Sequence, residues 1–83
     1  LRDLVALIEG QWRPPLGGEG RRATVYFTLE SNGMLSASRV ETGSGSLPFD
    51  RSTLAAVIDA APFPALPPGF TGQRLSVHLD FVE

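Results

Sequence analysis

The sequence has no cysteine, no lysine and no long apolar run. The absence of Cys among its 83 residues excludes a disulfide framework and thiolate chemistry. All seven basic residues are Arg, which we attribute to genome bias, and the net charge is −2. Without a basic run, we expect no nucleic-acid partner. No segment approaches the ~20 apolar residues of a membrane span and none is a signal peptide, so we expect no membrane contact by this segment.

The length of the chain sets the scale of the fold. Residues 1–83 make one expected domain with a small core, because a chain of this size buries only about 60% of its unfolded surface. The chain begins at Leu1 rather than Met, and we therefore expect it to be a piece of a longer protein.

The segment 24–40 predicts a β-hairpin around which the other elements are organised. Val25, Phe27 and Leu29 alternate with Thr and Tyr residues, which is the period of a strand with one buried face. The turn is Ser31-Asn32-Gly33, where glycine can supply a positive φ. One face of the hairpin is apolar and the other polar, so we expect a cover on the apolar face only.

The returning strand of this hairpin has an irregular apolar phase. Leu35 and Val40 are an odd number of residues apart, so a regular strand cannot turn both toward the core. A bulge near Ser36 or Ala37 would restore the phase. Ser38 and Val40 would then face the core.

The start of the chain predicts an amphipathic helix of about three turns. The apolar residues at helical spacing are Leu1, Leu4, Val5, Leu7, Ile8 and Trp12. Trp12, at the end of the helix, is large enough to seal one edge of a small core. Arg13-Pro14-Pro15 ends the helix, because proline disfavours helical backbone at the residue before it.

A second helix is predicted from Arg51 to about Ala61. Asp50 is the expected N-cap, and Phe49 with Leu54 fits a hydrophobic staple around it. Pro62 ends the helix. The residues expected on its buried face are Leu54, Val57, Ile58 and Ala61.

The proline-rich stretch 62–70 is expected to be a stiff extended connector, since proline removes backbone donors. Phe63, Leu66 and Phe70 would close the edge of the core. Pro64 and Pro67 have the spacing of a PxxP ligand, but the flanking aromatic residues favour a buried connector.

The clearest strand is Gln73–Val82. Its apolar residues alternate strictly with polar ones: Leu75, Val77, Leu79 and Phe81 against Arg74, Ser76, His78 and Asp80. His78 falls on the polar face, and a single His with no Cys and no nearby second ligand is more readily a surface residue than a metal ligand or a base.

The element order α-β-β-α-β predicts an α+β fold in two layers. A right-handed crossover places the third strand beside the first, giving a three-stranded antiparallel sheet of order 2-1-3 with two helices on one face. Because the apolar residues of the first and third strands must share a face, we expect Phe27 opposite Val77 and Glu30 opposite Arg74. The same register sets Tyr26 against His78.

The third strand is then a sheet edge, long, regular and free of proline. Its unpaired backbone groups are a template for a strand from a partner. The predicted partner-binding residues are Gln73, Arg74, Leu75, Ser76, Val77, His78, Leu79, Asp80 and Phe81.

Other kinds of site have weaker support in the sequence. The loop Gly43-Ser44-Gly45-Ser46 could cradle a phosphate, but it lacks the GxxxxGK[ST] and GxGxxG patterns. Asp50 as a catalytic acid is far less favoured than Asp50 as a cap. No nucleophile and base are placed together, so we expect no enzyme, no cofactor and no metal.

An ordered set of segments resembles the C-terminal domain of the TonB/TolA family over nearly the whole chain. The set consists of Gln11-Trp12-Arg13-Pro14-Pro15 after a helix, the hairpin with Asn32-Gly33 and Leu35, and the exit from Val40 to Gly43-Ser44-Gly45. It continues with Pro48-Phe49-Asp50 opening a helix with Ala55-Ala56-Val57, and with Pro62-Phe63-Pro64 before the last strand. The segments 12–15 and 48–50 are more similar to the TolA-type domains and their TonB-like relatives.

The resemblance implies a periplasmic domain of an energy transducer in a Gram-negative cell envelope. Family members are tethered to the inner membrane by an N-terminal helix and couple a proton-driven motor there to partners in the periplasm or outer membrane. They often grip an extended peptide segment by pairing it with their last strand. The implied partners are peptides of outer-membrane receptors or periplasmic proteins, and motor proteins through a region absent from this segment.

Three classes of function remain at this point. A peptide-binding adaptor that transmits force is favoured. A structural or oligomerisation module would use the same free edge on a second copy, as a weak homodimer, and light scattering at several concentrations separates the two. An enzyme or small-molecule binder is the least favoured class.

Overall fold

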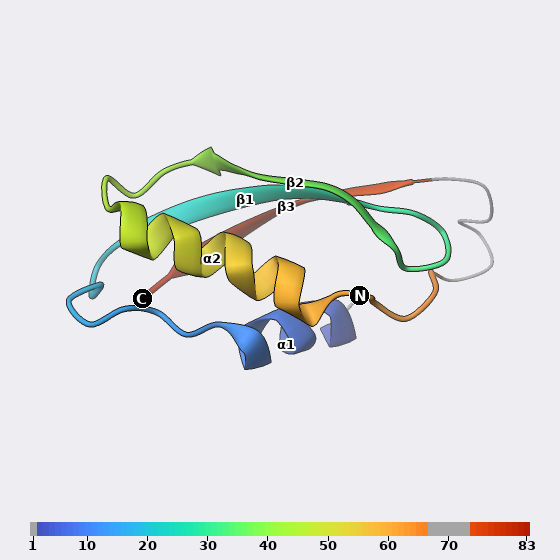
Figure 1. Ribbon diagram of the computed structural model, residues 1–83, viewed down its shortest axis with the longest axis horizontal. Helices are drawn as coiled ribbons and strands as arrows, with labels where there is room; N and C mark the ends of the chain where they lie inside the picture. The colour runs from blue at the N-terminus through green and yellow to red at the C-terminus, as the bar shows by residue number, and fades with distance from the viewer. Residues whose placement is uncertain (1, 67–73) are drawn as a thin grey trace.

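The computed structural model describes residues 2–66 and 74–83. The elements follow the predicted order, and they are α1 (Arg2–Gln11), β1 (Arg22–Leu29), β2 (Leu35–Thr42), α2 (Leu47–Ala60) and β3 (Leu75–Val82). Both helices lie on the same side of the sheet (Figure 1). The described part of the chain therefore forms the predicted two-layer α+β arrangement.

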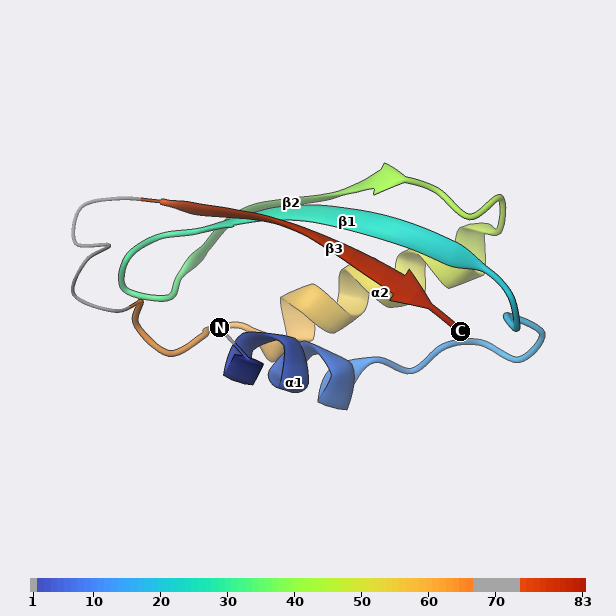
Figure 2. The ribbon, with the colours of Figure 1, turned by 180° about the vertical axis from the view of Figure 1, so that it is seen from behind.

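The sheet has the predicted order β2-β1-β3, with both pairings antiparallel. β1 is the central strand, and its apolar residues are the most completely buried of the sheet: Ala23, Val25, Phe27 and Leu29 have no exposed surface. Seen from behind, β3 runs along the outside of the sheet with α1 beneath it (Figure 2). The predicted topology is confirmed.

The predicted register between β1 and β3 is confirmed. Phe27 pairs with Val77, and Tyr26 pairs with His78. Beyond the end of the paired strands, Arg74 Nε lies 2.9 Å from Glu30 Oε2, as the same register requires. A one-residue slip would turn every apolar side chain of β3 to the solvent side, so the alternation excludes every odd shift. The pairing of Glu30 with Arg74 favours this register over a shift by two residues.

The predicted bulge in β2 is present at Ser36. Thr28 pairs with Ala37 and the next residue, Leu29, pairs with Leu35, so Ser36 is the extra residue. Its hydroxyl donates to Thr28 O at 3.2 Å.

A second irregularity, which the sequence analysis did not predict, leaves Glu41 without an opposite residue. Thr24 pairs with Thr42 and its neighbour Val25 pairs with Val40, so Glu41 is the extra residue. Two bulges in one edge strand increase its local twist.

The turn between β1 and β2 requires a glycine for two reasons. Gly33 has φ +89°, in the left-handed region. A Cβ added there would also lie 1.9 Å from the backbone oxygen of Phe63. This close approach is part of a contact between distant segments, because Phe63 N–H donates to Gly33 O at 3.0 Å and Leu66 N–H donates to Ser31 O at 2.9 Å.

The predicted start of α2 is wrong by one turn. The N-cap is Ser46, whose Oγ accepts from Phe49 N–H at 3.4 Å, and Pro48 lies in the first turn. Proline is tolerated there because the first N–H groups of a helix have no intrahelical acceptor. Asp50 and Phe49 are therefore inside the helix, and the Phe49–Leu54 staple around an Asp50 cap does not exist.

The buried face of α2 differs from the predicted one as a result. Its buried residues are Phe49, Thr53, Ala56 and Val57. Ile58 is half exposed and Leu54 is only partly buried, whereas Val57 is in the core as predicted. Thr53 is fully buried, and its hydroxyl is satisfied by donating to Asp50 O at 2.7 Å. Pro62 follows the end of the helix as predicted.

Only a narrow stripe of α1 is buried. Leu4 and Ile8 are in the core, while Val5 and Leu7, also predicted to face it, are 36% and 42% exposed. Leu1 lies outside the described residues. Trp12 packs edge-on against Phe49 and Phe81, with ring centroids 5.9 and 5.1 Å apart, and so closes one edge of the core as predicted.

The connector after α2 is partly buried, as the prediction required. Phe63 is 4% exposed and stacks on Phe27, with centroids 6.3 Å apart. Leu66 is partly buried, whereas Phe70 and Pro67 lie outside the described residues. The main cluster of the core consists of Leu4, Ile8, Val25, Phe27, Leu29, Ala56, Val57, Phe63 and Phe81, and Ala23 and Phe49 are buried as well.

Candidate functional site

β3 presents one free backbone edge. Within residues 2–66 and 74–83, its only strand neighbour is β1. The strand contains no proline and no bulge, so its outer side is regular and continuous from Leu75 to Val82. Such an edge offers N–H and C=O groups in the spacing that another strand requires.

The hydrogen bonds at the end of β3 fix which residues point outward. Glu83 N–H donates to Arg21 O at 3.2 Å and Glu83 O accepts from Gly20 N–H at 2.8 Å, so the backbone of Glu83 faces the β1 side. Backbone direction alternates along a strand. The outward N–H and C=O groups therefore belong to Ser76, His78, Asp80 and Val82.

The open face of the sheet carries a polar network that fixes the side chains of these same residues. Tyr26 Oη donates to Ser76 Oγ at 3.2 Å, and Thr24 Oγ1 donates to Asp80 Oδ1. The rings of Tyr26 and His78 pack edge-on at 4.9 Å. These cross-strand pairs hold β3 against β1 without using its outer edge.

The phenol of Tyr26 in this network has a lowered pKa. The hydroxyl of Ser76, and after it that of Thr28, can donate to the phenolate, and this lowers the pKa of Tyr26 below its usual 10.0. Arg39 adds to the effect, since its guanidinium lies 4.9 Å from the ring centroid.

The helix-facing side of β3 is incompletely covered. Leu75, Val77 and Leu79 are only partly buried, whereas Phe81 is 3% exposed. The cause is the narrow buried stripe of α1, which leaves Val5 unburied beside β3. A groove consequently runs between α1 and the edge strand.

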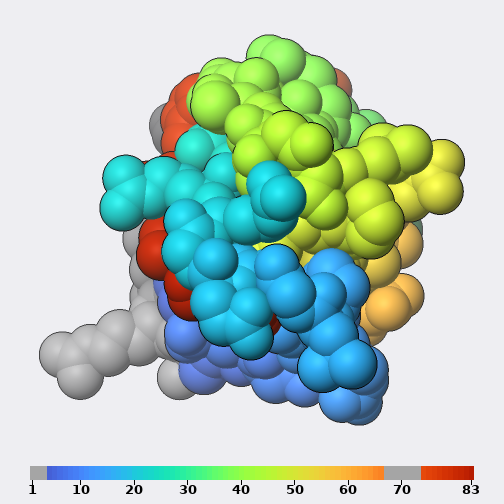
Figure 3. Space-filling view, turned by 90° about the vertical axis from the view of Figure 1, so that its left-hand side faces the viewer, coloured from blue at the N-terminus to red at the C-terminus, as the bar shows by residue number. Residues whose placement is uncertain are grey.

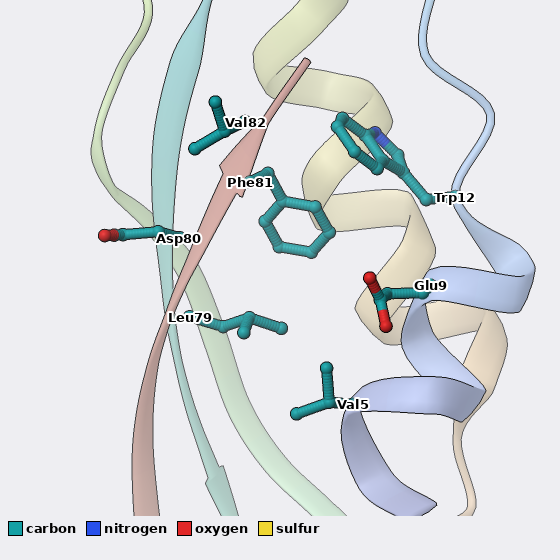
Figure 4. A pocket seen from close by; sticks show the side chains of 7 residues that line it. All are labelled: Val5, Glu9, Trp12, Leu79, Asp80, Phe81 and Val82. Atoms are coloured by element: carbon teal, nitrogen blue, oxygen red, sulfur yellow. The ribbon is translucent and has the colours of Figure 1, made fainter. Parts of the chain in front are cut away.

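This groove has a volume of about 190 Å³. It is lined by Val5, Glu9 and Trp12 on one side and by Leu79, Asp80, Phe81 and Val82 on the other. Figure 4 shows Leu79 and Phe81 pointing from β3 toward the helix, with Val5 and Glu9 opposite them, while Asp80 points away. The groove thus adjoins the free edge directly.

The indole of Trp12 forms the end wall of the groove and is held in place. Its Nε1–H donates to Ser52 Oγ at 3.1 Å, and the Ser52 hydroxyl donates to Phe49 O at 2.6 Å. With Phe49 and Phe81 packed on its faces and edges, the ring cannot swing out without breaking this bond. The wall is therefore preorganised for a ligand.

The loop 43–46 does not offer a phosphate cradle. Ser44 N–H donates to Asp50 Oδ1 at 2.8 Å, and Ser46 N–H donates to Ser44 Oγ at 3.1 Å, so these loop donors are already used. Arg21 Nη1 donates to Ser44 O at 3.1 Å. The loop 43–46 and the connection between α1 and β1 therefore meet at one end of the molecule (Figure 3). The role of Asp50 is to order this loop rather than to cap α2.

No group of His, Asp and Glu side chains in the part of the chain that the structure describes could hold a metal ion. No helix among those residues is long and apolar enough to cross a membrane. His78 lies 2.9 Å from Glu41 and is half exposed.

The structure places the predicted site residues Arg74–Phe81 together on one edge, and Gln73 lies outside the described residues. Sequence reasoning missed the groove residues on α1, namely Val5 and Glu9. No local signal separated them, because Val5 has the same helical spacing as Leu4 and Ile8 and was expected to face the core.

Comparison with known proteins identifies the fold. The family model described as TonB C terminal matches residues 2–81. A solution structure of TolA domain III bound to a peptide derived from the N-terminus of TolB is 25% identical, with a TM-score of 0.74, and the alignment covers 96% of this chain and 70% of that one. No curated protein matches the chain.

Two solution structures of the TonB C-terminal domain of Helicobacter pylori share the same fold. Both are 16% identical and are covered over 77% and 89% of their length, with TM-scores of 0.75 and 0.72. The alignments cover 99% of this chain. TonB and TolA C-terminal domains are protein-interaction domains of the cell envelope, periplasmic in known members, and not an enzyme family. Because the family model spans almost all of its residues, this chain belongs to the TonB C-terminal family.

Proposed function

We propose that this chain, acting as a single domain over residues 1–83, binds an extended peptide segment of a protein partner along the outer edge of β3. The observation that carries the proposal is the row of outward backbone groups at Ser76, His78, Asp80 and Val82, which no described strand pairs. Each hydrogen bond formed there contributes only about 0.5–1.5 kcal/mol net, so binding by backbone pairing alone is weak to moderate.

The similarity to TolA domain III supports a peptide as the ligand. That domain was solved with a peptide from the N-terminus of TolB, at 25% identity to this chain. The partners we propose are accordingly extended segments of periplasmic proteins or outer-membrane receptors. Because backbone hydrogen bonds would carry most of the affinity, substitution of the side chain of Ser76 or His78 in this chain is expected to change peptide binding little.

We further propose a place in the cell envelope. The domain would lie in the periplasm, tethered to the inner membrane through a preceding region, and would link a proton-driven motor there to its peptide partner. Membership of the TonB C-terminal family supports this arrangement.

The test is an NMR titration of the ¹⁵N-labelled domain with a synthetic peptide from the N-terminus of a TolB protein. The largest amide shifts are expected over Leu75–Val82, and β2 at the opposite edge should be spared. Shifts concentrated on β2 or on the loop 43–46 would overturn the proposal. Light scattering over a concentration series separates peptide binding from self-association, since pairing of β3 with a second copy would double the mass without a peptide.

A further inference from the structure

We infer that the groove between α1 and β3 selects among peptides, and that it takes an apolar side chain of the added strand with a basic residue close to it. The groove is lined by Val5, Glu9 and Trp12 and by residues 79–82. The inference rests on the proposed function, because the groove adjoins the edge at which the peptide would pair.

The geometry of strand addition directs partner side chains into this groove. An added strand lies about 4.8 Å from β3, and its side chains share the faces of the residues opposite them. The partner residues opposite Leu79 and Phe81 are two apart in the peptide, and both point toward α1. One of them therefore projects over the groove, whatever the direction of the peptide.

The size and lining of the groove favour an apolar side chain. Its volume of about 190 Å³ exceeds the roughly 150 Å³ that accommodates benzene in an engineered apolar cavity. Val5, Leu79 and Trp12 supply apolar surface, and Val5 is still 36% exposed. A residue the size of Leu, Ile or Phe would cover that surface and fill the space.

The charge of the groove favours a basic residue beside this anchor. Glu9 projects toward the groove from α1 (Figure 4), and no basic side chain lines the groove in the described part of the chain. A carboxylate at the rim attracts Arg or Lys and disfavours Asp or Glu at the neighbouring helix-facing position. The partner we infer is an extended peptide in which an apolar residue and a basic residue alternate on one face.

The experiment is a selection from an mRNA-displayed library of random 12-residue peptides against the wild-type domain and two charge-reversal variants. Glu9→Lys inverts the charge in the groove. Glu19→Lys makes the same change at another exposed position, in the connection before β1, and serves as the matched control. Wild type and the control are expected to enrich peptides with an apolar and a basic residue two apart, and Glu9→Lys to enrich an acidic residue in place of the basic one.

Binding of one selected peptide then tests the anchor. Replacing its apolar residue by Ala is expected to weaken binding about ten-fold, and Glu9→Lys to weaken it about five-fold. Trp12 is the only Trp in the chain. Its fluorescence should therefore shift when the parent peptide binds and shift much less with the Ala peptide.

Val5→Phe, which fills the groove, should remove the preference for the anchor, while Leu7→Phe on the same helix should not.

Failure of the proposed function and failure of this inference would give different results. If no peptide is enriched, the proposed function itself is overturned, together with this inference. If peptides are enriched and shift the amides of β3, but show no apolar and basic pattern or respond equally to Glu9→Lys and Glu19→Lys, the groove does not select them. Edge pairing would then stand and the inference would fall.

Discussion

The side chains of His78 and Glu41 meet across the central strand, with Nδ1 and Oε2 2.9 Å apart, although they belong to the two outer strands. The bulge that makes Glu41 an extra residue of β2 lies at this point. Because the side chains are 55% and 33% exposed, we expect the pair to contribute less than about 1 kcal/mol. A double-mutant cycle of His78→Ala and Glu41→Ala, measured by urea denaturation, should give a coupling energy of that size, and the coupling should decrease with added salt. A larger coupling that does not depend on salt would contradict this expectation.

The turn at Gly33 should be the least tolerant glycine position that the structure describes. Gly33→Ala combines a strained positive φ with a Cβ at 1.9 Å from Phe63 O. Gly17→Ala is the matched control, because Gly17 has φ +82° and no atom near its added Cβ. The control should cost about 1–2 kcal/mol in the free energy of unfolding, and Gly33→Ala clearly more. Equal costs for the two variants would show that the connector does not press on the turn.

The start of α2 can be tested with substitutions at two residues that both have capping side chains. Ser46→Ala removes the observed cap and should cost about 1 kcal/mol. Asp50→Ala removes the acceptor of Ser44 N–H and should also destabilise, by about 1–3 kcal/mol. Asp50→Asn keeps an oxygen acceptor for Ser44 N–H, so it should lower the free energy of unfolding less than Asp50→Ala does. Chemical denaturation measures all three, and a neutral Ser46→Ala would contradict Ser46 as the cap.

Tyr26 should ionise at a lower pH than an ordinary tyrosine, because the Ser76 hydroxyl, its largest influence, stabilises the phenolate and lowers the pKa. Since the folded-state pKa is the lower one, this contribution to stability is fully present above the usual 10.0 and is lost as the pH falls through the lowered value. Tyr26 is the only Tyr in the chain, so ultraviolet absorbance reports it alone. Ser76→Ala should raise its pKa toward the usual value, and an unchanged titration would exclude the hydrogen bond as the cause.

Proline substitutions along β3 should alternate in their effects. His78→Pro removes an outward N–H, which an edge strand tolerates, so the domain should fold while peptide binding falls. Leu79→Pro removes an N–H directed at β1 and should unfold the domain or destabilise it by about 3 kcal/mol. Circular dichroism monitors folding and the NMR titration monitors binding. Full binding by a folded His78→Pro variant would remove β3 from the site.

The features that followed from the sequence are those specified by a regular period. Alternation in Val25, Phe27 and Leu29 and in residues 75–81 determined the faces, and the faces limited the register to even shifts. The opposite charges of Glu30 and Arg74 favoured the observed one among these. The start of α2 was missed because both Ser46 and Asp50 can cap a helix. The position of Pro48 in the first turn and the use of Asp50 by the loop decided between them.

The groove could not be derived in the same way. Val5 and Glu9 contribute to it because of how α1 is rotated about its axis and how far it stands from β3. That rotation depends on the packing of Ile8 and Trp12 against partners distant in the sequence, which no local pattern encodes. The edge residues were predictable because topology alone makes β3 an outer strand.

The end of β3 is fastened beyond its ladder by the bonds between Glu83 and residues 20 and 21. A segment paired along Leu75–Val82 and pulled parallel to the strands would load all its hydrogen bonds at once, in shear. The same segment pulled sideways would break them one after another, as a zipper opens. The lifetime of the attachment would therefore depend on the direction of the pull as well as on affinity, and a lengthwise load would act on a strand that is bonded to its own sheet beyond the end of the ladder.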